Sequence, residues 1–265
     1  MLTIDLSTSV AVITGGSSGI GLAAAALFLR AGAAVAICGR NEARLREAEA
    51  RLRAGQPDGR LLATICDVLD EAQVRRFADA VAEHFGATDI LVNNAGQGRV
   101  STFADTSDTD WSDELRLKFF SLIYPTRAFL PLLERSTSAA VVCVNSLLAL
   151  QPEPHMVATS AARAGAQSLV HSMAIEFAPK GVRVNSILIG LVESGQWRRR
   201  FEARDDQAQT WKEWTAALAE RKGIPLGRLG TPEEAAQAIF HLATPLSSYT
   251  TGSHIDISGG LARHL

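Results

Sequence analysis

Three glycines near the beginning of this sequence are the residues that most clearly indicate a binding site. Gly15, Gly19 and Gly21 lie in the segment VAVITGGSSGIGLA, after an apolar run that predicts a strand and at the start of an amphipathic run that predicts a helix. Glycines in this context permit a tight turn and let the backbone approach a pyrophosphate, which the positive end of the helix stabilises. Three glycines alone are weak evidence, but the strand before and the helix after them supply the required context. The segment therefore predicts a dinucleotide-binding turn.

The end of the next predicted strand indicates which dinucleotide would bind. The sequence there is Cys38-Gly39-Arg40-Asn41, without the acidic residue that would bind the ribose hydroxyls of NAD. Arg40 carries a planar, permanently charged guanidinium that suits a 2′-phosphate. We therefore expect NADP rather than NAD. In the alternative interpretation, Arg40 simply begins the next helix in solvent.

Strands and helices that alternate along the chain would position these residues. Apolar runs predict strands at residues 10–14, 34–38, 61–66, 90–92, 140–144, 182–188 and 254–257. Amphipathic segments predict helices at residues 19–31, 42–54, 71–85, 110–133, 156–178 and 232–243. Strict alternation implies parallel strands with right-handed crossovers, and continuously apolar strands are typical of a sheet covered on both faces. We expect an α/β fold of the Rossmann type, with a doubly wound, seven-stranded parallel sheet in a single domain at residues 1–265.

Residues 193–222 interrupt this alternation. The segment is charged, contains Trp197, Trp211 and Trp214, and lies where a long crossover would pass over the carboxyl edge of the sheet. It forms either a helical lid over a substrate pocket or a packed pair of surface helices. Its basic run, Arg198-Arg199-Arg200, is interpreted as a solvated, partly helical face.

Composition excludes several classes of function. The formal net charge is −2, and no clustered positive charge suggests a surface for nucleic acid or anionic membrane. No apolar stretch approaches the ~18 residues of a membrane span, and the start lacks the pattern of a signal peptide. Cys38, Cys66 and Cys143 are expected to be buried free thiols, and neither they nor the histidines have metal-ligand spacing. We expect a cytoplasmic protein without a metal, whose partner is a small molecule.

Several further motifs make the chain resemble the short-chain dehydrogenase/reductase family over essentially its whole length. They are Thr14-Gly15-x-x-x-Gly19-x-Gly21, Cys66-Asp67-Val68, Asn93-Asn94-Ala95-Gly96, Gly227-Arg228 to Pro232-Glu233-Glu234, and Thr251-Gly252 to Ser258-Gly259-Gly260. The resemblance implies an oxidoreductase that acts on a hydroxyl or carbonyl of a small organic molecule. It also implies a homotetramer or homodimer built through the helices predicted at residues 110–133 and 156–178.

The resemblance extends the set of expected cofactor contacts. In the adenosine half of the cofactor, Asp67 and Val68 would contact the adenine, Asn94, Ala95 and Gly96 would contact the ribose, and Ser17 and Arg40 would contact the 2′-phosphate. In the nicotinamide half, Ile189 and Gly190 would lie beside the ring, and Val192 and Ser194 would lie near its carboxamide. Ser18 and Ile20 would complete the glycine turn.

The catalytic positions of the family are occupied by unusual residues. The family uses an Asn that anchors a water relay, a Ser that polarises the carbonyl, a Tyr that exchanges the proton, and a Lys, four residues after the Tyr, that lowers the Tyr pKa and holds the ribose. These positions correspond to Lys118, Ser146, Thr159 and Arg163, so only the serine is retained. A threonine hydroxyl is far less acidic than a phenol, and an arginine does not release its proton.

A different proton donor is therefore expected. Lys118 is one candidate if desolvation lowers its pKa, and the alternative is a helix lysine with a structural polar partner. His155 titrates near neutrality, but it is also interpreted as an exposed loop residue, and Glu153 shares its loop. Arg163 would still bind the ribose, and Thr159 would either take part in catalysis or enlarge the pocket.

Two functions remain open on the sequence alone. The first is an NADP-dependent oxidoreductase with a non-standard proton donor. The second is a catalytically impaired NADP-binding protein, such as a sensor or an assembly partner, because an intact glycine turn accompanies an altered catalytic set. A third candidate, a dehalogenase related to the family, is the least favoured, because such dehalogenases keep the tyrosine and lose the nucleotide turn, whereas this chain does the reverse.

Overall fold

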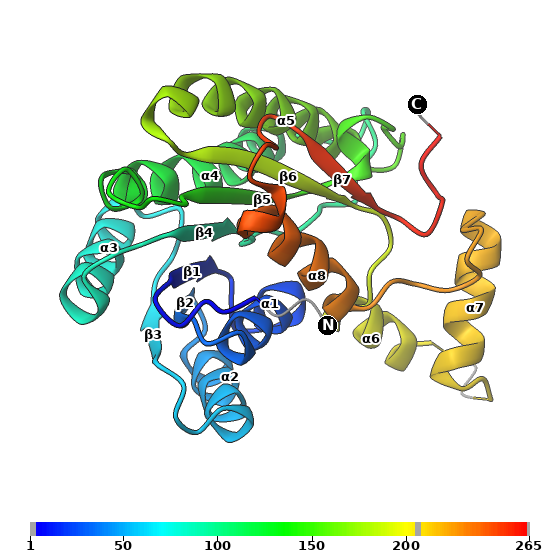
Figure 1. Cartoon of the computed structure of the whole chain (residues 1–265). Coiled ribbons are helices and arrows are strands. Elements are labelled where there is room, and N and C mark those ends of the chain that lie inside the picture. The colour runs from blue at the N-terminus through cyan, green and yellow to red at the C-terminus, as the bar shows by residue number, and fades with distance from the viewer. Residues whose placement is uncertain (1–3, 205–207, 264–265) are drawn as a thin grey trace.

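A parallel sheet lies at the centre of the computed structural model, which describes residues 4–204 and 208–263 (Figure 1). Within these residues, seven strands pair in the order β3-β2-β1-β4-β5-β6-β7, and every pairing is parallel. The strands are β1 (Val10–Thr14), β2 (Ala34–Gly39), β3 (Leu61–Ile65), β4 (Ile90–Asn93), β5 (Ala140–Ser146), β6 (Arg183–Ile189) and β7 (His254–Ile257). The doubly wound sheet predicted from the sequence is confirmed.

Helices cover both faces of this sheet. They are α1 (Gly19–Arg30), α2 (Glu42–Gly55), α3 (Glu71–Phe85), α4 (Asp108–Leu133), α5 (Val157–Phe177), α6 (Gly195–Glu202), α7 (Trp211–Lys222) and α8 (Pro232–Ala243). Figure 1 shows α3, α4 and α5 on one side of the sheet and α1, α2 and α8 on the other, with α6 and α7 set apart beyond its edge.

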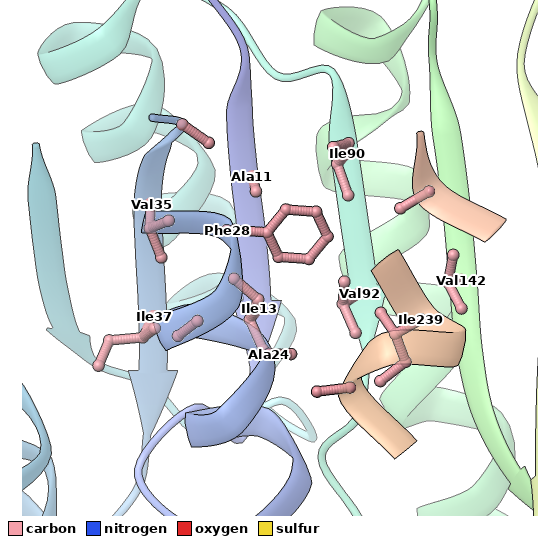
Figure 2. Close-up of a cluster of buried hydrophobic side chains, with 14 of the residues drawn as sticks. Ala11, Ile13, Ala24, Phe28, Val35, Ile37, Ile90, Val92, Val142 and Ile239 are labelled. Carbon is pink, nitrogen blue, oxygen red and sulfur yellow. The ribbon is translucent and has the colours of Figure 1, made fainter. Parts of the chain in front are cut away.

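The alternation of side chains along each strand divides the core into two layers. Ala11 and Ile13 of β1 pack in one cluster with Phe28 of α1 and Ile239 of α8 (Figure 2). Val12, between them in sequence, points to the opposite face and packs in the cluster that contains residues of α3, α4 and α5. Strands β1 to β6 therefore contribute to both layers, as expected for a parallel sheet buried on both sides, whereas the edge strand β7 contributes Ile255 and Ile257 to the first layer alone.

The predicted element boundaries differ from the observed ones by at most two residues. Helix α4 begins two residues earlier than predicted, because Ser107 caps it by accepting a hydrogen bond from the Asp110 N–H. Strand β5 continues to Ser146, which pairs with Ile189 of β6. The segment at residues 193–222 forms α6 and α7, and residues 205–207 of it lie outside the described residues.

The order of the strands places a crevice at their carboxyl ends. The chain leaves β1 toward β2 and β3 and then returns to β4 on the other side of β1, so the crossovers diverge there. Ligands of doubly wound folds bind at such a switch point. Thr14 joins the two strand ends, because its Oγ1 accepts hydrogen bonds from Asn94 N at 3.0 Å and Ala95 N at 3.1 Å.

Replacement of Phe129 by alanine tests the packing of this core. The Phe129 ring is fully buried in α4 and meets the edge of Phe77 of α3 at 5.5 Å between centroids. We expect Phe129→Ala to lower the free energy of unfolding by about 3–5 kcal/mol, measured by denaturant titration. Phe103, which is 78% exposed, provides the control, and Phe103→Ala should change stability by no more than about 0.5 kcal/mol. Similar losses in both variants would contradict this account of the core.

Candidate active site

A long cavity of about 440 Å³ runs along the carboxyl ends of the strands. Sixteen of the seventeen expected cofactor contacts border it, namely Gly15, Ser17, Ser18, Gly19, Ile20, Arg40, Asp67, Val68, Asn94, Ala95, Gly96, Arg163, Ile189, Gly190, Val192 and Ser194. The fold thus brings together residues separated by as many as 179 positions in the sequence.

The remaining predicted residue, Gly21, lies in α1 behind the cavity. A Cβ atom there would lie 2.4 Å from Asn94 Nδ2 and 2.5 Å from Gly15 O, so this glycine permits close packing of α1. Gly15 and Gly19 have φ angles of +66° and +54°, a region that side chains disfavour. The turn exposes the N-terminus of α1, where the Ser18 side chain makes no capping bond and the first turn holds no acidic residue. Such a terminus suits a pyrophosphate.

Two arginines border the end of the long cavity beside α2. The Arg40 side chain is 62% exposed, and its Nη1 lies 3.8 Å from Asp67 Oδ2. Arg44 borders the cavity as well and was missed by the sequence analysis. Its backbone N–H is held by the side chain of Asn41, the N-cap of α2. The signal for Arg44 was available, because it follows Arg40 by four residues in the first turn of a predicted helix.

The hydroxyl of Thr159 is occupied by neighbouring protein groups. Thr159 is 1% exposed, and its Oγ1 donates to Glu114 Oε2 at 2.6 Å. The same Oγ1 accepts a hydrogen bond from Arg99 N at 3.1 Å. Thr159 of α5 therefore connects α4 to the loop that follows β4.

Lys118 forms a buried ion pair one helical turn after Glu114. Its Nζ donates to Glu114 Oε2 at 2.9 Å and to the carbonyl oxygen of Gln97 at 2.6 Å. Burial, together with the nearby charge of Arg163, lowers the pKa of Lys118 to about 8, although Glu114 opposes the shift. Lys118 borders a small cavity of about 10 Å³, a size that one water molecule can occupy.

Glu114 was also missed by the sequence analysis. The pattern DWSDELRLKFF contains an acidic and a basic residue at i and i+4, which indicates a pair on one helix face. The rotation of α4 that buries this face depends on tertiary packing, so the sequence did not distinguish a buried pair from a solvated one.

Arg163 lies where the cavities meet. Its Nη1 donates to the Val144 carbonyl oxygen at 3.0 Å, and its buried Nε has no hydrogen-bond partner among the described residues. Burial lowers its pKa to about 10, so the guanidinium remains charged at neutral pH. It borders the long cavity, the small cavity beside Lys118, and a second cavity described below.

The second cavity has a volume of about 370 Å³ and adjoins the long one. The two share Gly98, Arg163, Ile189, Gly190, Gln196 and Trp197. Four of the five expected catalytic residues border it, namely Ser146, His155, Thr159 and Arg163, whereas Lys118 lies behind it. Leu147 and Leu148 also border it, whereas Leu150 does not.

The two remaining expected catalytic residues of this cavity, Ser146 and His155, differ in their hydrogen bonds and contacts. Ser146 Oγ accepts a weak hydrogen bond from Leu148 N at 3.3 Å, so its O–H is available to donate. His155 is half exposed, and its Nδ1 lies 3.3 Å from Glu153 Oε2. The same carboxylate oxygen lies 3.3 Å from Lys222 Nζ.

Other classes of site are not found in the part of the chain that the structure describes. Residues 4–204 and 208–263 contain no group of three potential metal ligands. In the same ranges, no helix is long and apolar enough to cross a bilayer. The three cysteines are buried and free, as predicted.

Comparison with known proteins places this geometry in context. Residues 15–262 match the family profile described as enoyl-(acyl carrier protein) reductase. The 3-oxoacyl-[acyl-carrier-protein] reductase of Thermotoga maritima is 31% identical over 97% of this chain and 98% of its own. The NADPH-bound structure of a Pseudomonas aeruginosa PAO1 short chain oxidoreductase, described as containing an atypical catalytic center, is 69% identical, with a TM-score of 0.95 over 98% of this chain and 99% of that one. The L-sorbose reductase of Gluconobacter frateurii, solved with NADPH and L-sorbose, is 30% identical with a TM-score of 0.93 over the full length of both chains.

Removal of one member of the buried ion pair tests its energetic role. We expect Glu114→Leu to lower the free energy of unfolding by about 3–5 kcal/mol at neutral pH, because it leaves the Lys118 ammonium buried without its carboxylate. The double variant Glu114→Leu/Lys118→Met should recover most of this loss, since apolar side chains of similar size replace both charges. Denaturant titration of the wild type and the variants measures both effects. A double variant no more stable than Glu114→Leu would show that the unpaired charge is not the cause.

Proposed function

Because this chain belongs to the short-chain dehydrogenase/reductase family, we propose that it is an NADPH-dependent oxidoreductase that interconverts a carbonyl and a hydroxyl on a small organic molecule. The observation that carries the proposal is the contact between the long and the second cavity at Arg163, Ile189 and Gly190. A cofactor in the first and a substrate in the second would be adjacent there. Solved relatives that bind NADPH support the choice of cofactor.

The chain offers a partner for each polar part of NADPH. The N-terminus of α1 would bind the pyrophosphate, and Arg40, Arg44 and Ser17 would bind the 2′-phosphate. Arg163 would donate to the hydroxyls of the nicotinamide ribose. When bound, NADPH supplies the hydride that reduces the carbonyl carbon.

The residues around the second cavity would polarise the substrate carbonyl and hold the site in place. The free O–H of Ser146 would donate to the carbonyl oxygen, and the charge of Arg163 would stabilise the negative charge that develops there. Thr159 serves as an anchor, because its hydroxyl already binds Glu114 and Arg99. It is therefore proposed as a positioning residue and not as the proton donor.

We assign the proton to Lys118. Its depressed pKa brings the ammonium close to the neutral range, where proton transfer is most effective. The small cavity beside it shares Gly96, Val144 and Arg163 with the long cavity, and a water molecule there would carry the proton from Lys118 toward the reacting oxygen. Glu114 holds the lysine in place. His155, paired with Glu153, remains the second candidate because it borders the second cavity directly.

Helices α6 and α7 are proposed as the cover of the substrate site. Trp197 of α6 borders both cavities, and it contacts Trp214 of α7 at 6.3 Å between ring centroids. Arg198 of α6 lies 3.8 Å from the ring centroid of Trp211. These contacts would make the two helices move together over the second cavity.

The assembly and location are proposed on the family likeness. A homotetramer or homodimer through α4 and α5 is supported by two exposed apolar side chains, Leu115 at 42% and Ile175 at 66% exposure. A cytoplasmic location accords with the overall charge and with free, buried cysteines.

The arginines beside α2 provide the test of cofactor choice. We expect Arg40→Ala and Arg44→Ala each to raise the Kd for NADPH about tenfold, because each removes a charged hydrogen bond to the 2′-phosphate, and to leave NADH binding unchanged. Arg51→Ala is the matched control, since Arg51 is exposed on α2 and does not border the long cavity. Titration by fluorescence of the reduced cofactor measures each Kd. Equal losses for NADPH and NADH would contradict a 2′-phosphate site.

The pH dependence of turnover tests the proton donor. Reduction of a panel of ketones, followed by the absorbance of NADPH, should slow above about pH 8, because the Lys118 ammonium loses its proton there. The reverse reaction, oxidation of alcohols, should accelerate over the same range. We expect Lys118→Met to lower kcat for reduction at least about hundredfold and to remove this limb of the profile, whereas His155→Gln should retain it. NADPH binding without turnover of any substrate would instead identify a cofactor-binding protein without this activity.

A further inference from the structure

The charges around the second cavity are unbalanced. Arg163, Arg200 and Lys222 are cations, and Glu153 is the one carboxylate among the described residues that border the cavity. With His155 neutral, three positive charges and one negative charge give these walls a formal charge of +2. Because Lys222 and Glu153 pair at 3.3 Å, the excess charge belongs to Arg163 and Arg200.

These two arginines occupy different parts of the site. Arg163 lies beside the long cavity and is already used there by the proposed function. Arg200 belongs to α6, is exposed, and borders only the second cavity. No hydrogen bond or ion pair links its guanidinium to another residue in the ranges 4–204 and 208–263. Among the residues that the structure describes, Arg200 is thus a cation at the cavity wall without an anion of its own.

The aromatic side chain beneath Arg200 leaves its donors available. The guanidinium carbon lies 4.7 Å from the ring centroid of Trp197, and Trp197 in turn packs against Trp214. A cation over an aromatic face is attracted by the ring, while the N–H groups along its edge stay free for hydrogen bonds. Such a fork matches the two oxygens of a carboxylate. The sequence predicted a solvated face for Arg198-Arg199-Arg200, but Arg200 also contacts Trp197 and borders the second cavity.

The rest of the cavity is mainly apolar. Leu147, Met156, Leu191 and Leu261 border it together with Trp197, and its volume of about 370 Å³ suits a small organic molecule. Ser146, the proposed partner of the reacting oxygen, belongs to the same walls. We propose that the substrate is an oxo or hydroxy carboxylic acid with an apolar body, and that Arg200 binds its carboxylate. This inference rests on the proposed function for the position of the reacting oxygen.

A comparison of acids with their neutral esters tests this inference. Benzoylformate, phenylpyruvate and levulinate would each be compared with its methyl ester, both in turnover with NADPH and in calorimetric binding to the protein–NADPH complex. We expect at least one acid to bind about tenfold more tightly than its ester, because a charged hydrogen bond is lost with the carboxylate. This preference should weaken as ionic strength rises, since Arg200 is exposed.

Variants of neighbouring arginines show whether Arg200 is responsible. Arg200→Met should remove the preference for the acid with little change for the ester, and Arg200→Lys should retain part of it. Arg199→Met is the matched control, because Arg199 is the adjacent exposed residue of α6 and does not border either cavity. We expect the control to bind acid and ester as the wild type does.

The two readouts separate this inference from the proposed function. Acids that bind no more tightly than esters, or a preference that survives Arg200→Met, would overturn the role of Arg200 even if both compounds are reduced. A preference for the acid that disappears in Arg200→Met would support that role. If Arg200→Met removes the preference in binding but no probe is turned over by the wild type, the role of Arg200 is supported and the proposed oxidoreductase activity is contradicted.

Discussion

The active site depends on one buried ion pair, between Lys118 and Glu114 on the inner face of α4. A lysine ammonium in this position is stable only if the surrounding groups satisfy its donors. Glu114 and the Gln97 carbonyl each accept a hydrogen bond from it, and Glu114 also accepts a hydrogen bond from the Thr159 hydroxyl. Helices α4 and α5 and the loop after β4 are held together by these bonds. Lys118 and Thr159, two of the three residues at altered catalytic positions, therefore belong to one structural unit.

The packing of the sheet beneath this unit does not depend on the polar residues of the site. Side chains of the strands pack in two apolar layers, whereas the polar residues of the site follow the carboxyl ends of the strands or project from helices. A change at Thr159 or Arg163 consequently alters the site without altering the pairing of β1 with β4. The fold is separable from the proposed proton-transfer groups for this reason, and likeness in fold alone does not determine the reaction.

The sequence was sufficient for the features that depend on local pattern. Alternating apolar and amphipathic runs predicted the sheet, and the turn from Gly15 to Gly21 predicted the long cavity. It was insufficient where tertiary packing decides the role of a charge. Glu114 is a surface residue by type, and only the rotation of α4 places it against Thr159. Arg200 belongs to a basic run that resembles a solvated face, and its role follows from the stacking on Trp197, which the sequence does not show.

The shared hydrogen bonds of Glu114 also constrain how such a site can arise in a lineage. The family's asparagine in place of Lys118 would leave a buried carboxylate supported by the Thr159 hydroxyl alone. An apolar residue in place of Glu114 would leave the lysine without its counter-ion, and we expect either single change to be less stable than the present pair. The effect of a change at one of these two positions therefore depends on the residue at the other, and a paired exchange avoids the unpaired buried charge that either single change leaves.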